Sequence, residues 1–260
     1  GGAVERCGNY LLEDGCRLGR GGFGEVFEVS VYNLTRTNVR AYARKYFAPS
    51  PEYDDTAIKE LTDLRQRFLV EIKTQCILNR INYDSIAPIV LFNTNGDKPY
   101  FVMELAECNL YDSIRKGMND VEKASAIIQI LKGIITIHDN NYIHRDLKPG
   151  NILYYTDGKY KITDFGLVKD RDTLRAEVKT KFQPNQMGTD GYRAPEIHES
   201  GLFSPQTDIF ALGKIITDVY SSGRSEKLRK LIAKCCAHWP EERYQDAQEL
   251  LDDFIKVSGV

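Results

Sequence analysis

The chain has few of the features that mark membrane proteins or nucleic-acid-binding proteins. Its 260 residues include 35 basic and 37 acidic side chains, for a formal net charge of −2, so no excess of positive charge points to nucleic acid or to an anionic membrane surface. No apolar run approaches the roughly 20 residues of a membrane-spanning helix. The length predicts one large domain or two lobes, long enough to bury a sizeable core.

Regular cysteine spacing is also missing. The chain contains no C-x-x-C pair, and its four histidines do not stand at the spacing of zinc ligands, so we expect no structural metal. A large chain without a secretion signal and with irregularly spaced cysteines is typical of a reducing compartment, so we expect free thiols and a cytoplasmic location. The cysteines are Cys7, Cys16, Cys76, Cys108, Cys235 and Cys236.

Strand patterns fill the first third of the chain, and helical patterns fill most of the rest. Residues 17–33 and 40–48 alternate as strands do, a long helical pattern covers 55–81, and two further strands are expected at 86–92 and 99–105. Beyond them we expect helices at 120–140, with Asp120 as N-cap, and at 207–220, 226–236 and 244–255. The change near residues 104–106 predicts two lobes, 11–105 and 106–257, with a ligand cleft between them.

The first motif is a glycine-rich stretch that ends in a valine. The stretch GRGGFGEV fits G-x-G-x-x-G-x-V with Gly19, Gly21, Gly24 and Val26. Glycines let a backbone approach phosphate closely. A dinucleotide fingerprint would need a helix directly after the third glycine, whereas FEVSVY continues as a strand. The pattern therefore favours a hairpin over phosphates, with a plain glycine-rich hairpin as the alternative.

Lys45 and Glu71 are candidates for a phosphate-neutralising ion pair. Lys45 follows Ala43 on the strand after the glycine loop, where an ammonium group could meet phosphate oxygens. Glu71 on the long helix could hold it. The alternatives are a solvated surface lysine and an ordinary acid on a helix surface, since position alone distinguishes Glu71 from Glu60.

The stretch HRDLKPGNIL, residues 144–153, places Asp146, Lys148 and Asn151 together after an apolar helix. An acid, a base and an amide at this spacing could handle a hydroxyl, a phosphate and a metal ion; the alternative is a polar loop with a Pro-Gly turn. DFG follows a short strand, and Asp164 in it could hold Mg²⁺ while Gly166 supplies backbone freedom. Taken alone, a D-x-G tripeptide is an ordinary turn.

The order of these motifs is far more specific than any one of them. The motifs follow one another in a fixed order: the glycine loop, A-x-K, the helix glutamate, HRDLKPGN, DFG, GT…APE and an aspartate before an apolar helix. This order is itself the standard signature of protein kinases. From about residue 11 to 255 the chain resembles a eukaryotic-type serine/threonine protein kinase catalytic domain. The resemblance implies an α+β, two-lobed kinase fold: an antiparallel sheet plus helix C in the N-lobe, and a mainly helical C-lobe.

The resemblance also implies a role for each motif residue. Asp146 would act on the substrate hydroxyl, Lys148 on the transferring phosphoryl group, and Lys45, held by Glu71, on the α- and β-phosphates. Asn151 and Asp164 would bind Mg²⁺, and Thr189 would belong to the catalytic set. ATP would be held by Leu18, Gly19, Gly21, Gly24, Val26, Ala43, Lys45, Met103 as gatekeeper, Glu104 to Ala106 as hinge, and Leu153.

The implied activity is transfer of the γ-phosphate of ATP, with Mg²⁺ or Mn²⁺, to serine or threonine of protein substrates. Lys148 and Thr189 favour this acceptor class. Autophosphorylation through self-association is expected, and nucleic-acid or membrane partners are not. The alternatives are a dual-specificity kinase and a pseudokinase scaffold; an oxidoreductase lacks the strand–GxGxxG–helix unit that it would need.

Three departures from the family pattern carry expectations. Only 35 positions separate Asp208 from Arg243, the expected partner of Glu196, so we expect one helix there and no helix G. Thr74 and Gln75 replace apolar residues beneath Glu71, which implies either a register shift to Cys76 and Ile77 or a different partner for Lys45. Arg145 could pair with a phosphate on the basic segment 168–192, for which Thr173 and Thr180 are the candidates, or that segment is simply a solvated basic loop.

Overall fold

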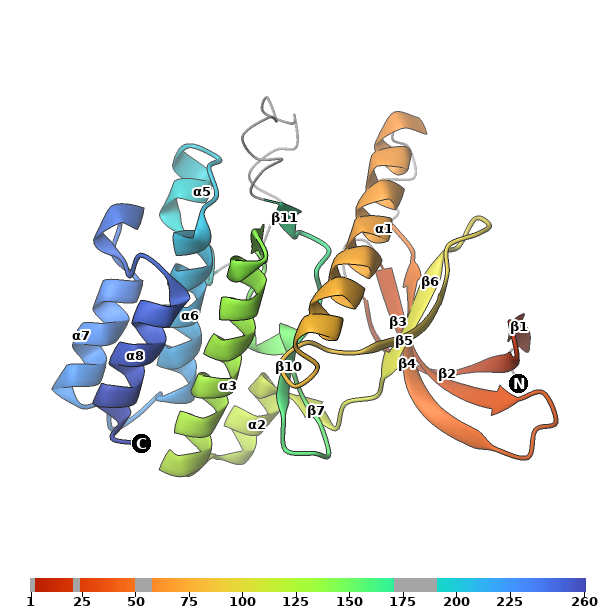
Figure 1. The fold of residues 1–260 in the computed structure, drawn as a ribbon, viewed down its shortest axis with the longest axis horizontal. Helices are drawn as coiled ribbons and strands as arrows, with labels where there is room; N and C mark the ends of the chain where they lie inside the picture. Colours follow the sequence, from red (N-terminus) through yellow and green to blue (C-terminus); the bar gives the residue numbers. More distant parts are fainter. Residues whose placement is uncertain (1–2, 21–23, 50–57, 171–190) are drawn as a thin grey trace. The chain divides into compact units, whose positions relative to one another are not determined.

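The computed structural model describes residues 3–20, 24–49, 58–170 and 191–260. These residues divide into two compact units (Figure 1). The first unit comprises residues 1–79 and 87–105, and the second comprises residues 80–86 and 106–260. The predicted α+β class is confirmed, because an antiparallel sheet with one long helix forms the first unit and helices dominate the second.

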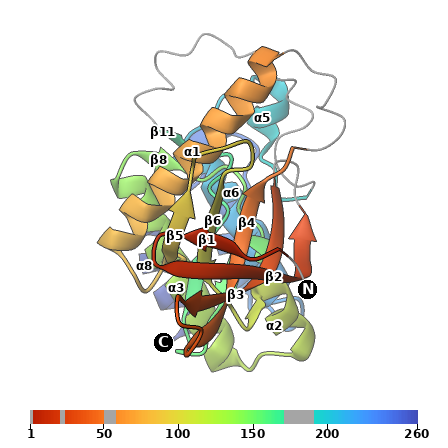
Figure 2. The same ribbon diagram turned by 90° about the vertical axis from the view of Figure 1, so that its right-hand side faces the viewer.

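A six-stranded antiparallel sheet in the order β1-β2-β3-β4-β6-β5 builds the first unit. Its strands are β1 (Glu5–Cys7), β2 (Tyr10–Arg20), β3 (Gly24–Asn33), β4 (Val39–Phe47), β5 (Ile89–Asn93) and β6 (Tyr100–Glu104). Figure 2 shows β1 running beside β2. β1 precedes residue 11, where the predicted N-lobe begins, and is nevertheless part of this sheet.

Helix α1 (Ile58–Ile81) covers one face of the sheet. Phe68 on the helix stacks against Phe47 of β4 and Phe101 of β6, with ring centroids 5.7 and 5.6 Å apart. The opposite face has its own apolar cluster, formed by Leu12, Val29, Val31, Tyr100 and Val102. Burial on both faces explains why the strands are rich in β-branched and aromatic residues.

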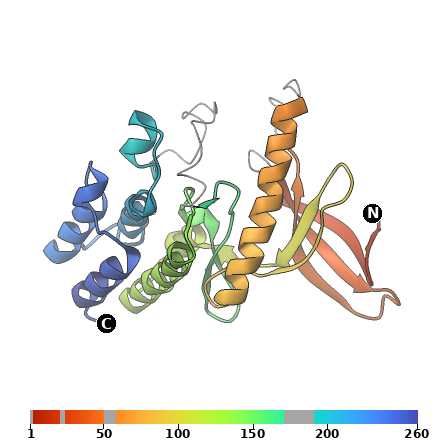
Figure 3. The same ribbon diagram turned by 45° about the horizontal axis from the view of Figure 1, so that its top comes forward.

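The second unit is built around α3 (Asp120–Asp139), which packs against α6 (Pro205–Val219), α8 (Ala247–Ser258) and β10 (Tyr160–Ile162). α8 lies beside α3 in two views (Figure 1 and Figure 3). Apolar residues of α3 at helical spacing are almost fully buried: Ile127, Ile130, Leu131, Ile134 and Ile137. The predicted N-cap is wrong by one residue: Asn119 caps α3 and forms a capping box with Glu122, because its amide oxygen reaches the third helical N–H.

Short elements complete the second unit. Its remaining helices are α2 (Leu110–Lys116), α5 (Pro195–Glu199), α7 (Glu226–Cys235) and the 3-10 turns Pro149–Asn151 and Pro240–Glu242. β7 (Cys108–Asn109), β9 (Ile152–Tyr154) and β10 form one small sheet, and β8 (Tyr142–Ile143) and β11 (Lys169–Asp170) form another. In the described stretch from residue 191 onward, α7 is the single α-helix between α6 and Arg243, as predicted.

Two further observations concern expectations from composition. All six cysteines lie within the described residues and are free thiols, as expected. None of the helices seen in the described part of the chain combines the length and the apolar character that crossing a bilayer would require.

Candidate active site

In the first unit, Lys45 of β4 faces α1. Its Nζ lies 2.6 Å from Oε1 of Glu71, whose side chain is 2% exposed. The register of the sheet produces this contact, because Lys45 stands opposite Phe101, and Phe101 packs directly beneath α1. A buried carboxylate strongly favours a paired cation, so the ammonium group is held at one place on the sheet.

The same face carries three of the residues predicted to surround adenine. Val26 stands opposite Lys45, Ala43 lies two residues before it, and Met103 stands opposite Ala43. Residues opposite each other in antiparallel strands share a face, so these three side chains form an apolar surface next to Lys45. Leu18 lies at a bulge in β2 and is exposed, and Glu104 ends β6.

Gly24 allows β3 and β4 to approach closely at this surface. A Cβ atom added at Gly24 would lie 2.6 Å from the backbone oxygen of Tyr46 and 3.2 Å from Cε of Lys45. Gly19 meets no such neighbour. Gly21 lies outside the described residues. The third glycine of the motif is therefore required by packing against the strand that carries Lys45.

The two polar residues below Glu71 are themselves buried. Gln75 is fully buried, and its Nε2 donates to the backbone oxygen of Ala87 at 2.9 Å and approaches Sδ of Met103 at 3.6 Å. Thr74 is buried as well. Gln75 therefore occupies the position next to Met103 without a shift to Cys76, and Glu71 remains opposite Lys45.

In the second unit, Asp208 on α6 holds the HRD segment, residues 144–146. Its carboxylate accepts the backbone N–H groups of His144 and Arg145, each at 2.9 Å, and lies 2.8 Å from Nε2 of His138. Burial raises the pKa of Asp208, but hydrogen bonds from His138 and Arg145 and the nearby histidines outweigh it and lower the pKa on balance. The loop is thus attached through its backbone to a buried anion.

Asp146 follows directly, with Asn151 beside it. Nδ2 of Asn151 donates to the backbone oxygen of Asp146 at 2.8 Å and lies 3.4 Å from its carboxylate. The pKa of Asp146 is raised, first by burial and then by the negative charge of Asp164, while Lys148 and His144 act in the opposite direction. Asp146 and Asp164 are therefore close enough to repel each other.

Asn151 and Asp164 fit a divalent cation. The backbone N–H of Thr163 donates to the backbone oxygen of Asn151 at 3.0 Å, which brings Asp164 next to Asn151. Asp164 adopts a φ of 60°, unusual for a residue other than glycine. Oxygen ligands beside two mutually repelling carboxylates suit Mg²⁺, which commonly takes one or two protein ligands and completes its shell with water and phosphate. Within the described residues, no group of three or more His, Cys, Asp and Glu side chains is arranged so that it could hold a metal ion.

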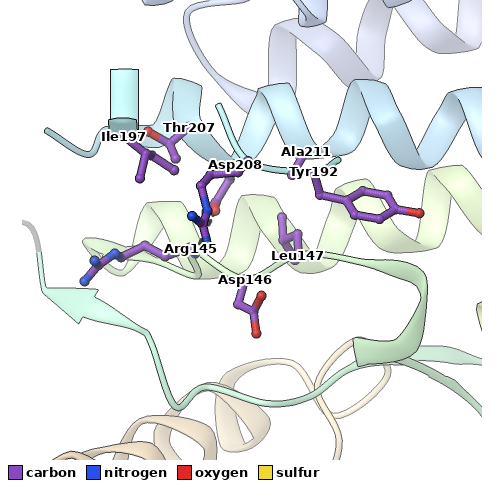
Figure 4. A pocket seen from close by; sticks show the side chains of 9 residues that line it. Arg145, Asp146, Leu147, Tyr192, Ile197, Thr207, Asp208 and Ala211 are labelled. Carbon is purple, nitrogen blue, oxygen red and sulfur yellow. Dashed lines mark hydrogen bonds between the residues drawn. The ribbon is translucent and has the colours of Figure 1, made fainter. Parts of the chain in front are cut away.

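A pocket lies beneath the loop, lined by Arg145, Asp146, Leu147, Tyr192, Arg193, Ile197, Thr207, Asp208 and Ala211. Figure 4 shows the side chains of Arg145 and Asp146 leaving the loop in different directions. The predicted Glu196–Arg243 pair is present and bidentate, with both N···O distances 2.8 Å. It attaches α5, next to the pocket, to the segment after α7.

The other predicted site residues include three in the second unit. Lys148 is half-buried in the loop, Leu153 lies on β9 and Ala106 precedes β7, all in the second unit. Thr189, Thr173 and Thr180 lie outside the described residues. Sequence reasoning missed His138, although a histidine on the apolar face of α3 was a usable signal. It also missed Phe203, whose ring centroid lies 3.5 Å from Cζ of Arg145.

Comparison with known proteins yields consistent matches. The protein kinase domain family matches residues 12–224. Cyclin-dependent kinase F-3 of Oryza sativa subsp. japonica is 34% identical over 212 residues, 78% of this chain and 43% of that protein. A calcium/calmodulin-dependent protein kinase of Metarhizium anisopliae is 33% identical over 193 residues, 70% of this chain and 49% of that protein. Putative cysteine-rich receptor-like protein kinase 16 of Arabidopsis thaliana is 28% identical over 239 residues, 88% and 33% of the two chains. The chain spans less than half the length of these relatives.

Proposed function

Because the chain belongs to the protein kinase family, we propose that it transfers the γ-phosphate of ATP to serine or threonine hydroxyls of protein substrates. The observation that carries this proposal is the loop around Asp146. This loop combines a carboxylate with a raised pKa, an amide hydrogen-bonded to the backbone of the same residue and the negative charge of Asp164 nearby, and a buried aspartate holds the backbone directly before Asp146. Phosphoryl transfer depends mainly on such positioning and on electrostatic stabilisation.

In the second unit, we assign Asp146 to the substrate hydroxyl, whose proton it accepts or orients. A raised pKa makes its carboxylate a stronger base than a solvent-exposed aspartate. Lys148 neutralises charge on the transferring phosphoryl group. Asn151 and Asp164 hold Mg²⁺, with Mn²⁺ as a substitute. When bound, the ion neutralises phosphate oxygens and lowers the repulsion between Asp146 and Asp164.

In the first unit, Lys45 contacts the α- and β-phosphates and Glu71 holds its ammonium group in place. The glycine loop, with Gly19, Gly21 and Gly24, covers the phosphates. We assign adenine contacts to Leu18, Val26, Ala43 and Leu153, with Met103 as gatekeeper and the backbone of Glu104 to Ala106 as hinge. The apolar surface formed by Val26, Ala43 and Met103 beside the Lys45–Glu71 pair supports this assignment.

The finer features of the activity form part of the same proposal. Lys148 in DLKPGN is typical of kinases that act on serine and threonine, and we assign Thr189 to the same catalytic set. Self-association would allow autophosphorylation at Thr173 or Thr180. The six free thiols support a cytoplasmic location, and a signalling role belongs to the same proposal.

Intact-protein mass spectrometry tests the proposal. After incubation with Mg²⁺ and ATP, the wild-type chain should gain phosphate that maps to serine or threonine, and Asp146→Asn should gain it slower by orders of magnitude. Because Asp146 acts on the hydroxyl and not on the nucleotide, the thermal shift caused by ATP should survive in the variant. That shift should be lost without Mg²⁺. Near-normal transfer by Asp146→Asn would refute the assigned role, and modification of tyrosine alone would refute the acceptor class.

A further inference from the structure

Arg145 is held in an unusual conformation directly before Asp146. Its φ is 74°, in the left-handed region that residues other than glycine rarely adopt. Such a conformation persists only where surrounding contacts determine it. One such contact is the hydrogen bond from its backbone N–H to Asp208. The position of Asp146 therefore depends on what holds Arg145.

The side chain of Arg145 is held by an aromatic ring. Arg145 is 9% exposed, and its guanidinium carbon lies 3.5 Å from the ring centroid of Phe203. This distance is well inside the range of a cation–π contact, and such contacts are stronger when water is excluded. The planar guanidinium group can stack on the ring while its N–H groups still bond at the edge.

Phe203 is a firm support because its own ring is packed. It lies between α5 and α6 and contacts a buried cluster of Ala194, Ile197 and Phe210. The next residue, Ser204, is the N-cap of α6. Asp208, which holds the backbone of Arg145, lies five positions after Phe203. One short stretch of chain therefore holds both the backbone and the side chain of Arg145.

We propose that Phe203 is a positioning residue of the phosphoryl-transfer reaction, which acts through Arg145 to hold Asp146 toward the acceptor hydroxyl. This inference rests on the proposed function. The stack supplies a partner for Arg145 within the folded second unit. Loss of the ring should slow phosphate transfer more than it weakens ATP binding.

Steady-state kinetics with ATP and dephosphorylated casein test this inference in Phe203→Leu, Phe203→Tyr and the matched control Leu202→Ala. Leucine keeps an apolar side chain and removes the π face, so kcat should fall about tenfold while KM for ATP changes less than about twofold. Tyrosine keeps the ring and should restore kcat. Leu202 is 69% exposed, and its variant should resemble wild type.

A double-mutant cycle with Arg145→Leu identifies the route of the effect. If Phe203 acts through Arg145, Phe203→Leu should cause no further loss of kcat in the Arg145→Leu background. Full additivity of the two losses would overturn the inference. The inference would also be overturned if Phe203→Leu and Phe203→Tyr lost kcat equally and both had a lower melting temperature, because that result would indicate a packing role.

The two proposals can fail separately. Wild-type kcat in Phe203→Leu, together with loss of transfer in Asp146→Asn, would overturn the role of Phe203 and leave the proposed function intact. Absence of transfer by the wild-type chain to casein and to itself would overturn the proposed function and this inference with it.

Discussion

Carboxylates hold residues in both units, but they bind different atoms in each. In the first unit they bind the side chains of Arg44 and Lys45, and in the second unit a carboxylate binds the backbone of the HRD segment. Arg44 and Lys45 are neighbours on β4 and therefore point to opposite faces of the sheet. Lys45 pairs with Glu71 of α1, and Arg44 pairs with Glu5 and Asp14. In the second unit, one carboxylate accepts the backbone N–H groups of the segment.

This difference determines how each site can be disturbed. An ion pair between side chains can separate when one element shifts, and the strand that carries it stays in its sheet. A buried carboxylate that accepts backbone N–H groups cannot be replaced without leaving those donors unsatisfied. We therefore expect the second unit to be more sensitive than the first to loss of a single charged partner.

The largest effect is expected for Asp208→Asn. The amide would present N–H donors toward the backbone N–H of His144 or Arg145, so at least one buried donor would lose its acceptor. Breaking a buried charged network of this kind costs about 3–5 kcal/mol. Denaturant titration should show this loss of unfolding free energy, while Asp139→Asn, an exposed acid at the end of α3, should leave it unchanged. Equal stability of the two variants would contradict the comparison.

A smaller effect is expected for Arg44→Met. Arg44 is 1% exposed, and its guanidinium carbon lies 3.8 Å from the Tyr100 ring centroid and 4.4 Å from that of Tyr46. Methionine can occupy much of this space, and both Glu5 and Asp14 retain access to water, so we expect a loss of about 1–3 kcal/mol.

The control for Arg44→Met is Arg40→Met, an exposed arginine on the same strand. Transfer activity of folded Arg44→Met should match wild type, because Lys45 lies on the other face of the sheet. A melting temperature as low as that of Asp208→Asn, or a specific loss of activity, would count against the distinction between the two faces.

The smallest effect, of opposite sign, is expected for the stability of Asp146→Asn. The pKa of Asp146 is raised in the folded chain, so its ionised form opposes folding, and the wild type loses stability as pH rises through that raised pKa. Asparagine does not titrate. The variant should therefore gain melting temperature over wild type at about pH 8 and lose that gain at about pH 3, below the pKa of an unfolded aspartate. A difference independent of pH would exclude this origin.

Much of the fold could be predicted because its signals are local. The apolar spacing of α3, the alternation in β3 and β4 and the length between Asp208 and Arg243 are properties of neighbouring residues, and the structure agrees with each of them. The two-residue strands β7, β8 and β11 could not be predicted, because so short a strand exists only through its partner. The N-cap of α3 was missed by one residue because Asn119 and Asp120 are both good caps.

The sequence by itself determined which residues can carry the chemistry, since the order from the glycine loop to DFG and APE is written in the chain. Only the tertiary structure decided which residues support them: Glu5 with Arg44, Gln75 with Met103, His138 with Asp208 and Phe203 with Arg145. These pairs are separated by 28 to 70 positions in the sequence. Local periodicity specifies which face of an element is buried, whereas the partner across that face depends on how distant elements pack.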